Sequence, residues 1–277
     1  MTHTERPVQK KEPKDPKELS VVSGYGEVAV KGRRREMEDA HTIIADFRGN
    51  SSEFFAGVYD GHGGRKTADY LARYLHKNLR NELDAGFTAE RAIDHAFEIT
   101  DTQVTREGII DGSTVVIAYI QNETLFVGNA GDARAVLSRN GKPIRLSHDH
   151  KADDPDEVKR IRKAGGFVTS EYQTEIPRVN GILAISRSIG DHGVELDGFI
   201  SHEPFITNTK LGPTDKSLIL ACDGVWDVLS DSAAVDIVDG IGDPKEAAIA
   251  LKDEALNRRS GDNISVIVIK LKIPSSK

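Results

Sequence analysis

The length, composition and charge of this chain exclude several classes of protein. The chain has 277 residues, of which 38% are hydrophobic and 29% charged, enough for one large domain with a substantial core. Its net charge of −7 argues against a nucleic-acid partner, which needs a basic surface to meet phosphates. Cys222 is the only cysteine, so no intrachain disulfide forms and we expect a reducing compartment, the cytoplasm or the nucleus. Because no apolar run approaches the roughly 18 residues of a membrane span, no membrane partner is expected.

Residues 1–20 predict an arm without stable structure, ahead of a single domain over residues 21–273. The arm is rich in charge, holds Pro13 and Pro16, and contains almost nothing apolar. Such a composition does not bury enough surface to offset the entropy cost of folding. We therefore expect the fold to begin near residue 21.

The stretch from Phe54 to Gly64 organises the prediction for the rest of the domain. An apolar segment of strand character stops at Asp60, and three glycines follow within four residues. Apolar side chains then recur at helical spacing over residues 65–83. A strand therefore delivers a carboxylate to the edge of the core. An isolated Asp-Gly pair is ordinary turn chemistry, so a functional interpretation depends on whether other acids arrive in the same way.

The rest of the chain predicts blocks of strands and helices. Strands are expected from apolar runs at residues 21–30, 42–47, 115–120, 124–129, 180–191, 217–222 and 264–271. Helices are expected at residues 65–83, after the N-cap Thr88, and at residues 157–164, 233–241 and 244–258. Asn140 and Gly141 predict a two-residue hairpin turn.

Residues 147–179 differ in character and predict a flap. Asp154 and Pro155 fit the N-cap and first position of a short charged helix that stops at Gly165. The residues after that helix are polar and irregular. We interpret the insertion as a mobile flap over or beside the functional site.

Four aspartates stand beside a glycine at the end of an apolar strand segment: Asp60, Asp132, Asp223 and Asp262. Glu38 and Asp39 add two acids just before a strand. By itself, the charged segment that contains them would predict a turn exposed to solvent. Carboxylates gathered at one end of a core raise one another's pKa unless a cation neutralises them. Oxygen ligands without cysteine favour Mg²⁺ or Mn²⁺ over Zn²⁺.

Two further residues receive structural interpretations. Cys222 lies inside a buried strand, and no arginine stands at the spacing of a cysteine-phosphatase loop, so we expect an inert thiol. Asp191 ends a strand, and we interpret it as an acid bonded to backbone.

Seven motifs in order give the chain a close resemblance to a known family. They are Arg34-x-x-Met37-Glu38-Asp39, Val58-Tyr59-Asp60-Gly61-His62-Gly63-Gly64, Gly112-Ser113-Thr114, Asn129-Ala130-Gly131-Asp132-Ala133-Arg134, Leu183-Ala184-Ile185-Ser186-Arg187-Ser188-Ile189-Gly190-Asp191, Asp223-Gly224-Val225-Trp226-Asp227 and Gly261-Asp262-Asn263. Together they resemble the metal-dependent protein phosphatases, the PPM or protein phosphatase 2C type. The resemblance runs from about Gly24 to Leu271. One motif would be a weak signal, whereas seven in order are highly specific.

The resemblance implies an α+β fold and a set of metal ligands. The fold is a four-layer α/β/β/α sandwich, with two stacked antiparallel sheets flanked by helix pairs. By similarity, Asp60 bridges two Mg²⁺ or Mn²⁺ ions. Glu38 and the Gly61 carbonyl are the other implied ligands of one ion, and Asp223 and Asp262 are those of the other. Asp39 and Asn263 are implied to orient waters bound to the ions. Asp132 and Asp227 are implied to form a weaker third metal site.

The resemblance also implies the reaction. A water shared by the two ions attacks phosphorus without a phosphoenzyme intermediate, and the substrates are phosphoserine and phosphothreonine proteins. Arg34 would grip phosphate oxygens through its planar guanidinium. His62 would donate a proton to the departing oxygen. Without the family resemblance, the sequence around His62 would equally allow a structural hydrogen bond behind the metals. We expect a monomer.

Two alternatives and two departures accompany this interpretation. A catalytically inactive scaffold typically loses metal ligands, and here every matched ligand is present; a metal-dependent nuclease is disfavoured by the acidic charge. Val115 stands where the family usually has a smaller residue, which removes no ligand. The predicted flap lacks tryptophan, since Trp226 is the only one in the chain, so docking through a flap tryptophan is unsupported.

Overall fold

The computed structural model describes residues 20–169, 176–193 and 195–274. The predicted arm therefore lies outside the described residues apart from Ser20, and so do residues 170–175 of the predicted flap.

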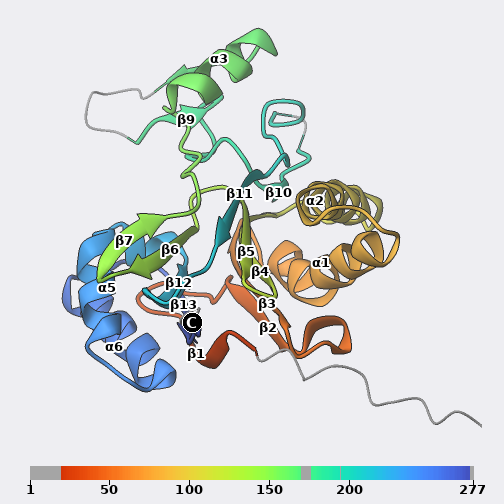
Figure 1. Cartoon of the computed structure of the whole chain (residues 1–277). Coiled ribbons are helices and arrows are strands. Elements are labelled where there is room, and N and C mark those ends of the chain that lie inside the picture. Colours follow the sequence, from red (N-terminus) through yellow and green to blue (C-terminus); the bar gives the residue numbers. More distant parts are fainter. Residues whose placement is uncertain (1–19, 170–175, 194, 275–277) are drawn as a thin grey trace, which may run out of the picture.

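Two antiparallel sheets stacked face to face form the centre of the molecule (Figure 1). The first sheet contains, in spatial order, β1 (Val22–Val30), β13 (Ile264–Leu271), β12 (Asp215–Ala221), β6 (Arg134–Arg139) and β7 (Lys142–Arg145). The second contains β11 (Phe205–Lys210), β5 (Thr124–Ala130), β4 (Gly112–Gln121), β3 (Glu53–His62) and β2 (Ala40–Ala45), with the short β10 (Ile189–Gly190) paired to β4. The first and last strands of the chain are therefore neighbours in one sheet.

Helices cover the outer face of each sheet (Figure 1). The helices α1 (Lys66–Asp84) and α2 (Ala89–Arg106) pack on the second sheet, and α5 (Asp231–Asp239) and α6 (Pro244–Asn257) pack on the first. The cap expected at Thr88 forms, since its side chain accepts a hydrogen bond from the first turn of α2, and Asp243 caps α6 in the same way. The four-layer sandwich is thus confirmed. No helix in the described part of the chain is long and apolar enough to cross a membrane.

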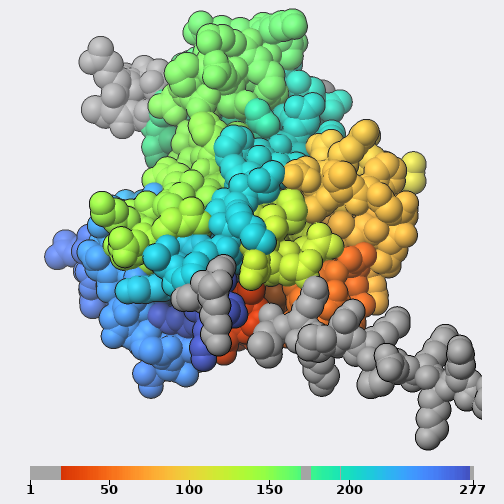
Figure 2. Space-filling view, viewed as in Figure 1, coloured from red at the N-terminus to blue at the C-terminus, as the bar shows by residue number. Residues whose placement is uncertain are grey.

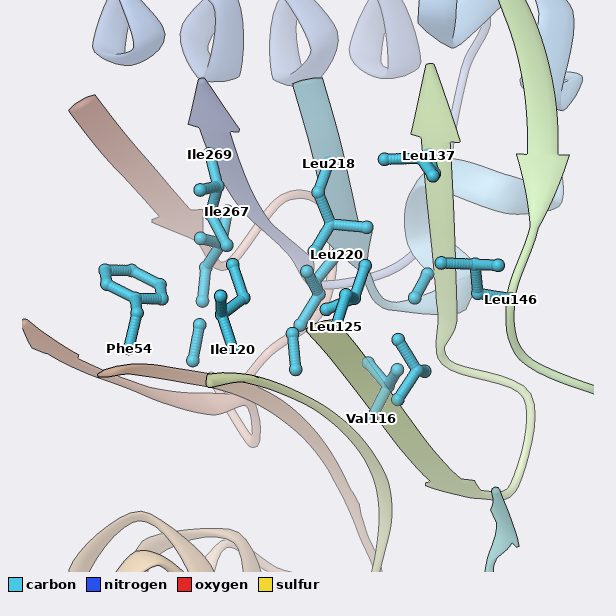
Figure 3. Packing of buried hydrophobic residues seen from close by; sticks show 14 of the residues in the cluster. Phe54, Val116, Ile120, Leu125, Leu137, Leu146, Leu218, Leu220, Ile267 and Ile269 are labelled. Atoms are coloured by element: carbon cyan, nitrogen blue, oxygen red, sulfur yellow. The ribbon is translucent and has the colours of Figure 1, made fainter. Parts of the chain in front are cut away.

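Side chains from the inner faces of both sheets interlock to form the main core (Figure 3). Phe54, Val116 and Ile120 come from the second sheet, and Leu220 and Ile267 from the first. Alternate residues of β3 point to the opposite face and pack under α1 and α2, because successive side chains of a strand alternate in direction. Because both faces of these strands are buried, their sequences are continuous runs of apolar residues.

Residues 147–169 and 176–179 leave the sandwich and carry α3 (Pro155–Lys163), which lies beyond the sheets at the top of Figure 1. This segment also contains β8 (Val168–Thr169) and β9 (Arg178–Val179). Its apolar side chains Ala152, Ile161 and Val179 pack with Leu196 into a small cluster separate from the sandwich core. The mobility expected of it stays a prediction.

One predicted strand is wrong, and, apart from the two-residue strands β8 and β9, one strand was missed. Residues 180–188 form turns and isolated bridges, and only Ile189 and Gly190 pair as a strand. Asn180 and Gly181 adopt positive φ angles, which end strand pairing at that point. The missed strand is β11, whose pattern of partly buried and exposed residues gives a weak apolar signal at the edge of its sheet.

The packing between the sheets yields a test of the core. Ile267→Ala removes a fully buried side chain, and we expect the free energy of unfolding to fall by about 2–5 kcal/mol. Urea unfolding measures this change. Ile110→Ala, at a side chain that is 83% exposed, is the matched control and should cost less than about 0.5 kcal/mol. Equal losses for the two variants would contradict the assignment of this core.

Candidate metal centre

The carboxylates singled out in the sequence meet at one edge of the sandwich, where strand ends from both sheets converge. Asp60 stands near the end of β3, opposite Thr114 of β4. Asp223 follows β12 and Asp262 precedes β13, and these two strands are antiparallel neighbours, so both acids reach the same edge. Asp132 lies on the short connection from the second sheet to the first. The convergence follows from the strand order.

Gly61 allows the segment that carries Glu38 and Asp39 to lie against β3. A Cβ at Gly61 would stand 2.5 Å from the carbonyl oxygen of Glu38, closer than real side chains approach. A second close approach occurs at Gly224, where a Cβ would overlap the carbonyl oxygen of Asn263. Glycine at both positions therefore brings the backbone segments of the site together.

Asn263 fastens the segment of residues 31–38 to the start of β13. Its side-chain Nδ2 donates to the carbonyl oxygens of Lys31 (2.8 Å) and Glu36 (2.9 Å), and its Oδ1 accepts from the Glu38 N–H at 2.8 Å. Both amide hydrogens are thus engaged by backbone. The contacts show a positioning function for Asn263 that its sequence motif did not reveal.

A cavity of about 670 Å³ opens over the converging acids. Most of the predicted site residues line it: Arg34, Glu38, Asp60, Gly61, His62, Asp132, Asp223, Asp227 and Asp262. Asp39 lies just beneath, with ligand atoms of Asp39, Asp60 and Cys222 within 4.8 Å of one another. Ile176, Pro177 and Arg178, at the end of the predicted flap, form part of the opposite wall. The flap region therefore borders the site.

The electrostatics of the buried acids fit a site for cations. Burial, and after it the charges of Asp223 and Asp39, raise the pKa of Asp60 well above its usual range. Burial and the charges of Asp132 and Asp227 raise the pKa of Asp223 to about 8. Neither carboxylate oxygen of Asp39, nor Oδ1 of Asp223, has a hydrogen-bond partner among the described residues. Oxygens that are buried, repelling and unpartnered are what divalent cations satisfy.

Cys222 lies beneath the acids as a neutral thiol. Its Sγ lies 3.4 Å from the Asn263 carbonyl and accepts from the Ser265 N–H at 3.2 Å. Burial and the nearby charge of Asp39 raise the pKa of the thiol well above its usual range. A thiol held neutral is a poor ligand and a poor nucleophile, in agreement with the inert function expected from the sequence.

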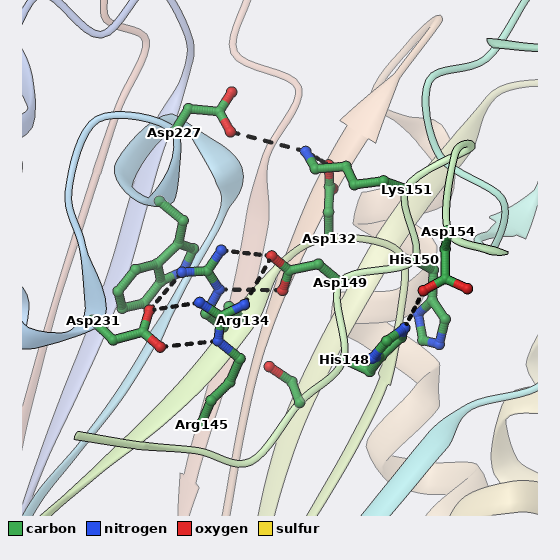
Figure 4. A network of polar contacts seen from close by, with 12 residues as sticks. Asp132, Arg134, Arg145, His148, Asp149, His150, Lys151, Asp154, Asp227 and Asp231 are labelled. Atoms are coloured by element: carbon green, nitrogen blue, oxygen red, sulfur yellow. Dashed lines mark hydrogen bonds and ion pairs between the residues drawn. The ribbon is translucent and has the colours of Figure 1, made fainter. Parts of the chain in front are cut away.

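Lys151 enters the site from the start of the α3 segment, a contact that the sequence did not indicate. Its Nζ forms an ion pair with Asp132 and lies 3.9 Å from Oδ1 of Asp227 (Figure 4). Its ammonium group therefore stands at the third metal position that the resemblance implied. Beside it, Arg134 pairs with Asp149 and Asp231, which holds the connection between the sheets in place (Figure 4).

Asp191 makes a contact that corrects its interpretation from the sequence. Among the described residues its carboxylate bonds to side chains and not to backbone: Oδ2 lies 2.8 Å from His62 Nε2 and accepts from the Ser188 hydroxyl. Burial alone lowers the pKa of His62, but the hydrogen bond and charge of Asp191 outweigh burial and raise it overall. The two residues are 129 positions apart, so no local pattern could have paired them.

Arg34 lies exposed at the mouth of the cavity. Its side chain is 54% exposed, and Nη2 lies 2.5 Å from Oδ2 of Asp262. A planar guanidinium at the mouth of the cavity, bonded to a single carboxylate oxygen, keeps donors available for a bound anion.

Comparisons with known proteins give the family and the fold. A family model described as protein phosphatase 2C matches residues 23–264. "Protein phosphatase 2C homolog 1" of Schizosaccharomyces pombe is 41% identical over 251 residues, which cover 86% of this chain and 70% of that protein. Among solved structures, a C. elegans sex-determining protein superposes with a TM-score of 0.81 at 25% identity, over 92% of this chain and 66% of the other. A serine-threonine phosphatase 2C from Toxoplasma gondii gives a TM-score of 0.79 at 22% identity, over 92% and 98%, which shows a shared fold.

The family match spans nearly the whole described domain, and the yeast relative is aligned along most of its own length. The chain belongs to the protein phosphatase 2C family of protein serine/threonine phosphatases.

Proposed function

We propose that this phosphatase hydrolyses phosphoserine and phosphothreonine in proteins by a metal-dependent mechanism that uses two Mg²⁺ or Mn²⁺ ions. The observation that carries the proposal is the set of acids gathered at one sheet edge. The pKa values of Asp60 and Asp223 are raised, and oxygens of Asp39 and Asp223 lack hydrogen-bond partners among the described residues. A retained ligand set of this kind argues against an inactive scaffold. The proposed working unit is a monomer in the cytoplasm or nucleus.

The residues that would hold the ions come from both sheets. Asp60 would lie between the two ions, with Glu38 and the Gly61 carbonyl on one side and Asp223 and Asp262 on the other. When bound, such ions acidify a shared water and orient it toward phosphorus. A third ion at Asp132 and Asp227 would have to displace the ammonium group of Lys151, which already pairs with Asp132.

Two side chains at the cavity would act on the substrate directly. Arg34 would leave Asp262 and donate hydrogen bonds to the phosphate oxygens, where its planar fork matches two oxygens at once. His62 would donate its proton to the departing seryl or threonyl oxygen. Because Asp191 raises the pKa of His62, the imidazole keeps this proton to higher pH than a free histidine does.

The first test removes the proposed bridging carboxylate. Asp60→Asn is expected to lower kcat on a phosphoserine peptide with Mn²⁺ by about 100-fold or more, because a preorganised charge is lost. Circular dichroism should show an intact fold, since the change relieves repulsion among buried acids. Asp94→Asn, at an exposed acid of α2, is the control and should leave activity unchanged. An active Asp60→Asn enzyme, or activity that survives chelation, would refute the metal-dependent mechanism.

The second test uses the raised pKa of Asp223, which is about 8 against an ordinary 3.8. Without cations the folded chain therefore holds more protons than the unfolded chain, and the free energy of unfolding should fall as pH rises between about 4 and 8. Mn²⁺ must displace the proton, so its affinity should increase from about pH 6 to pH 8. Calorimetry in buffers of different ionisation enthalpy measures the released protons. Binding that releases none would contradict the proposal.

The third test concerns phosphate recognition. Arg34→Ala removes a charge-assisted donor pair, and we expect KM for a phosphopeptide to rise about tenfold or more while kcat changes less. Arg34→Lys keeps the charge without the planar fork and should recover only part of the loss. Steady-state kinetics of the two variants give the answer. An unchanged KM in Arg34→Ala would rule out direct phosphate binding by this residue.

A further inference from the structure

A second polar cluster lies directly behind the His62–Asp191 pair, on helix α2. Asp101 is buried, with 6% of its surface exposed. Its Oδ1 accepts hydrogen bonds from the Gly190 N–H at 2.9 Å and lies 3.0 Å from His192 Nε2, and its Oδ2 lies 3.4 Å from His202 Nδ1. One carboxylate therefore ties the residues on either side of Asp191 to α2.

The backbone between those two contacts is in an unfavourable conformation. Gly190 has φ +90° and Asp191 has φ +60°, a left-handed conformation that costs energy for a residue with a Cβ. Strand β10 contributes only two paired residues, so the sheet alone holds this turn weakly. A turn of this kind keeps its shape only where surrounding contacts fix it, and Asp101 supplies two of them.

The carboxylate of Asp191 occupies a narrow space. A Cβ at Gly112 would overlap the Asp191 carboxyl group, so glycine is needed there for the carboxylate to reach His62. A displacement of the turn would move the Asp191 carboxylate out of this space and away from His62 Nε2, which Oδ2 contacts at 2.8 Å.

The surroundings of Asp101 are polar and partly open. A cavity of about 410 Å³ borders Asp101, His192, His202 and Arg160. Figure 2 shows residues near 200 (cyan) between the α3 segment (green) and helices α1 and α2 (orange). Ile189, just before the turn, packs into the apolar cluster under α2, whereas residues 190–192 of the turn itself are attached to α2 through the hydrogen bonds of Asp101. Burial would raise the pKa of Asp101, but bonds from both histidines and Gly190 lower it, so the group is a carboxylate at neutral pH.

We propose that Asp101 is a positioning residue for phosphate-ester cleavage, which clamps the Gly190–Asp191 turn to α2 and thereby keeps Asp191 aligned with His62. The inference rests on the proposed function, in which His62 donates a proton. In that step the bond from water oxygen to phosphorus forms, the bond from phosphorus to the seryl oxygen breaks, and the seryl oxygen takes the proton of His62. A misplaced donor slows this step only when the leaving oxygen needs a proton.

The leaving group therefore separates positioning from general structural support. A phosphoserine peptide releases a strongly basic alkoxide, which needs a proton as it leaves. p-Nitrophenyl phosphate releases a weakly basic phenolate, which can leave without one. Asp101→Asn should lower kcat on the peptide about tenfold or more with KM unchanged, and kcat on p-nitrophenyl phosphate less than about threefold. Asp94→Asn on the same helix is the matched control and should change neither rate.

A second variant acts on the other end of the same chain of contacts. Gly112→Ala keeps every ionisable group but displaces the Asp191 carboxylate, so it should reproduce the selective loss. Its control is Gly193→Ala, at an exposed glycine with open space around it. In an Asp191→Asn background, Asp101→Asn should have no further effect on the peptide rate, because the two residues act through one path.

His62→Gln distinguishes the possible failures. If His62→Gln shows no preference between the two substrates, the proton-donor function of His62 fails and the inference fails with it. If His62→Gln is selective but Asp101→Asn and Gly112→Ala slow both substrates equally, or neither, the positioning function alone is overturned. Additive losses in the double variant would overturn it as well.

Discussion

The repulsion among buried carboxylates is the constraint on which the functional part of this structure depends. Asp60 belongs to one sheet, whereas Asp223 and Asp262 flank strands of the other, so stacking the sheets forces the acids together. The interlocked apolar side chains between the sheets supply the favourable free energy that holds this arrangement. Divalent cations at this edge would join the two sheets as well as neutralise the acids. Catalysis and cohesion of the sandwich would then draw on the same contacts.

Much of the fold and most of the acids could be predicted because their signals are local. A run of apolar residues that ends or begins at an acid beside a glycine marks the edge of a sheet, and Asp60, Asp223 and Asp262 each show this pattern. The helix caps at Thr88 and Asp243 are also local, because each capping residue bonds to the residue three positions further along the chain. The stacking of the two sheets was implied by the family resemblance, since periodicity alone does not say which strands pair.

The remaining features depend on contacts between distant residues. Asp191 reaches His62 only because β10 pairs with β4, and two residues of strand leave no periodic signal. In the sequence, Lys151 is one of several charged residues in a charged segment. Its pairing with Asp132 depends on the fold, because the connection between the sheets brings Asp132 beside it. Strand pairing was also expected where Asn180 and Gly181 adopt positive φ angles, which a single sequence does not reveal. In each case the tertiary arrangement, and not local propensity, decides the outcome.

The side-chain amide of Asn263 has a consequence for how the protein is made. It grips the backbone on both sides of Arg34, yet it belongs to the beginning of β13, the final strand of the sandwich. A growing polypeptide thus leaves the ribosome before the segment that carries Arg34 and Glu38 is fastened, and nearly all of the domain must be synthesised before this anchor forms. The enzyme would therefore be inactive during translation and become active only when β13 pairs with β1.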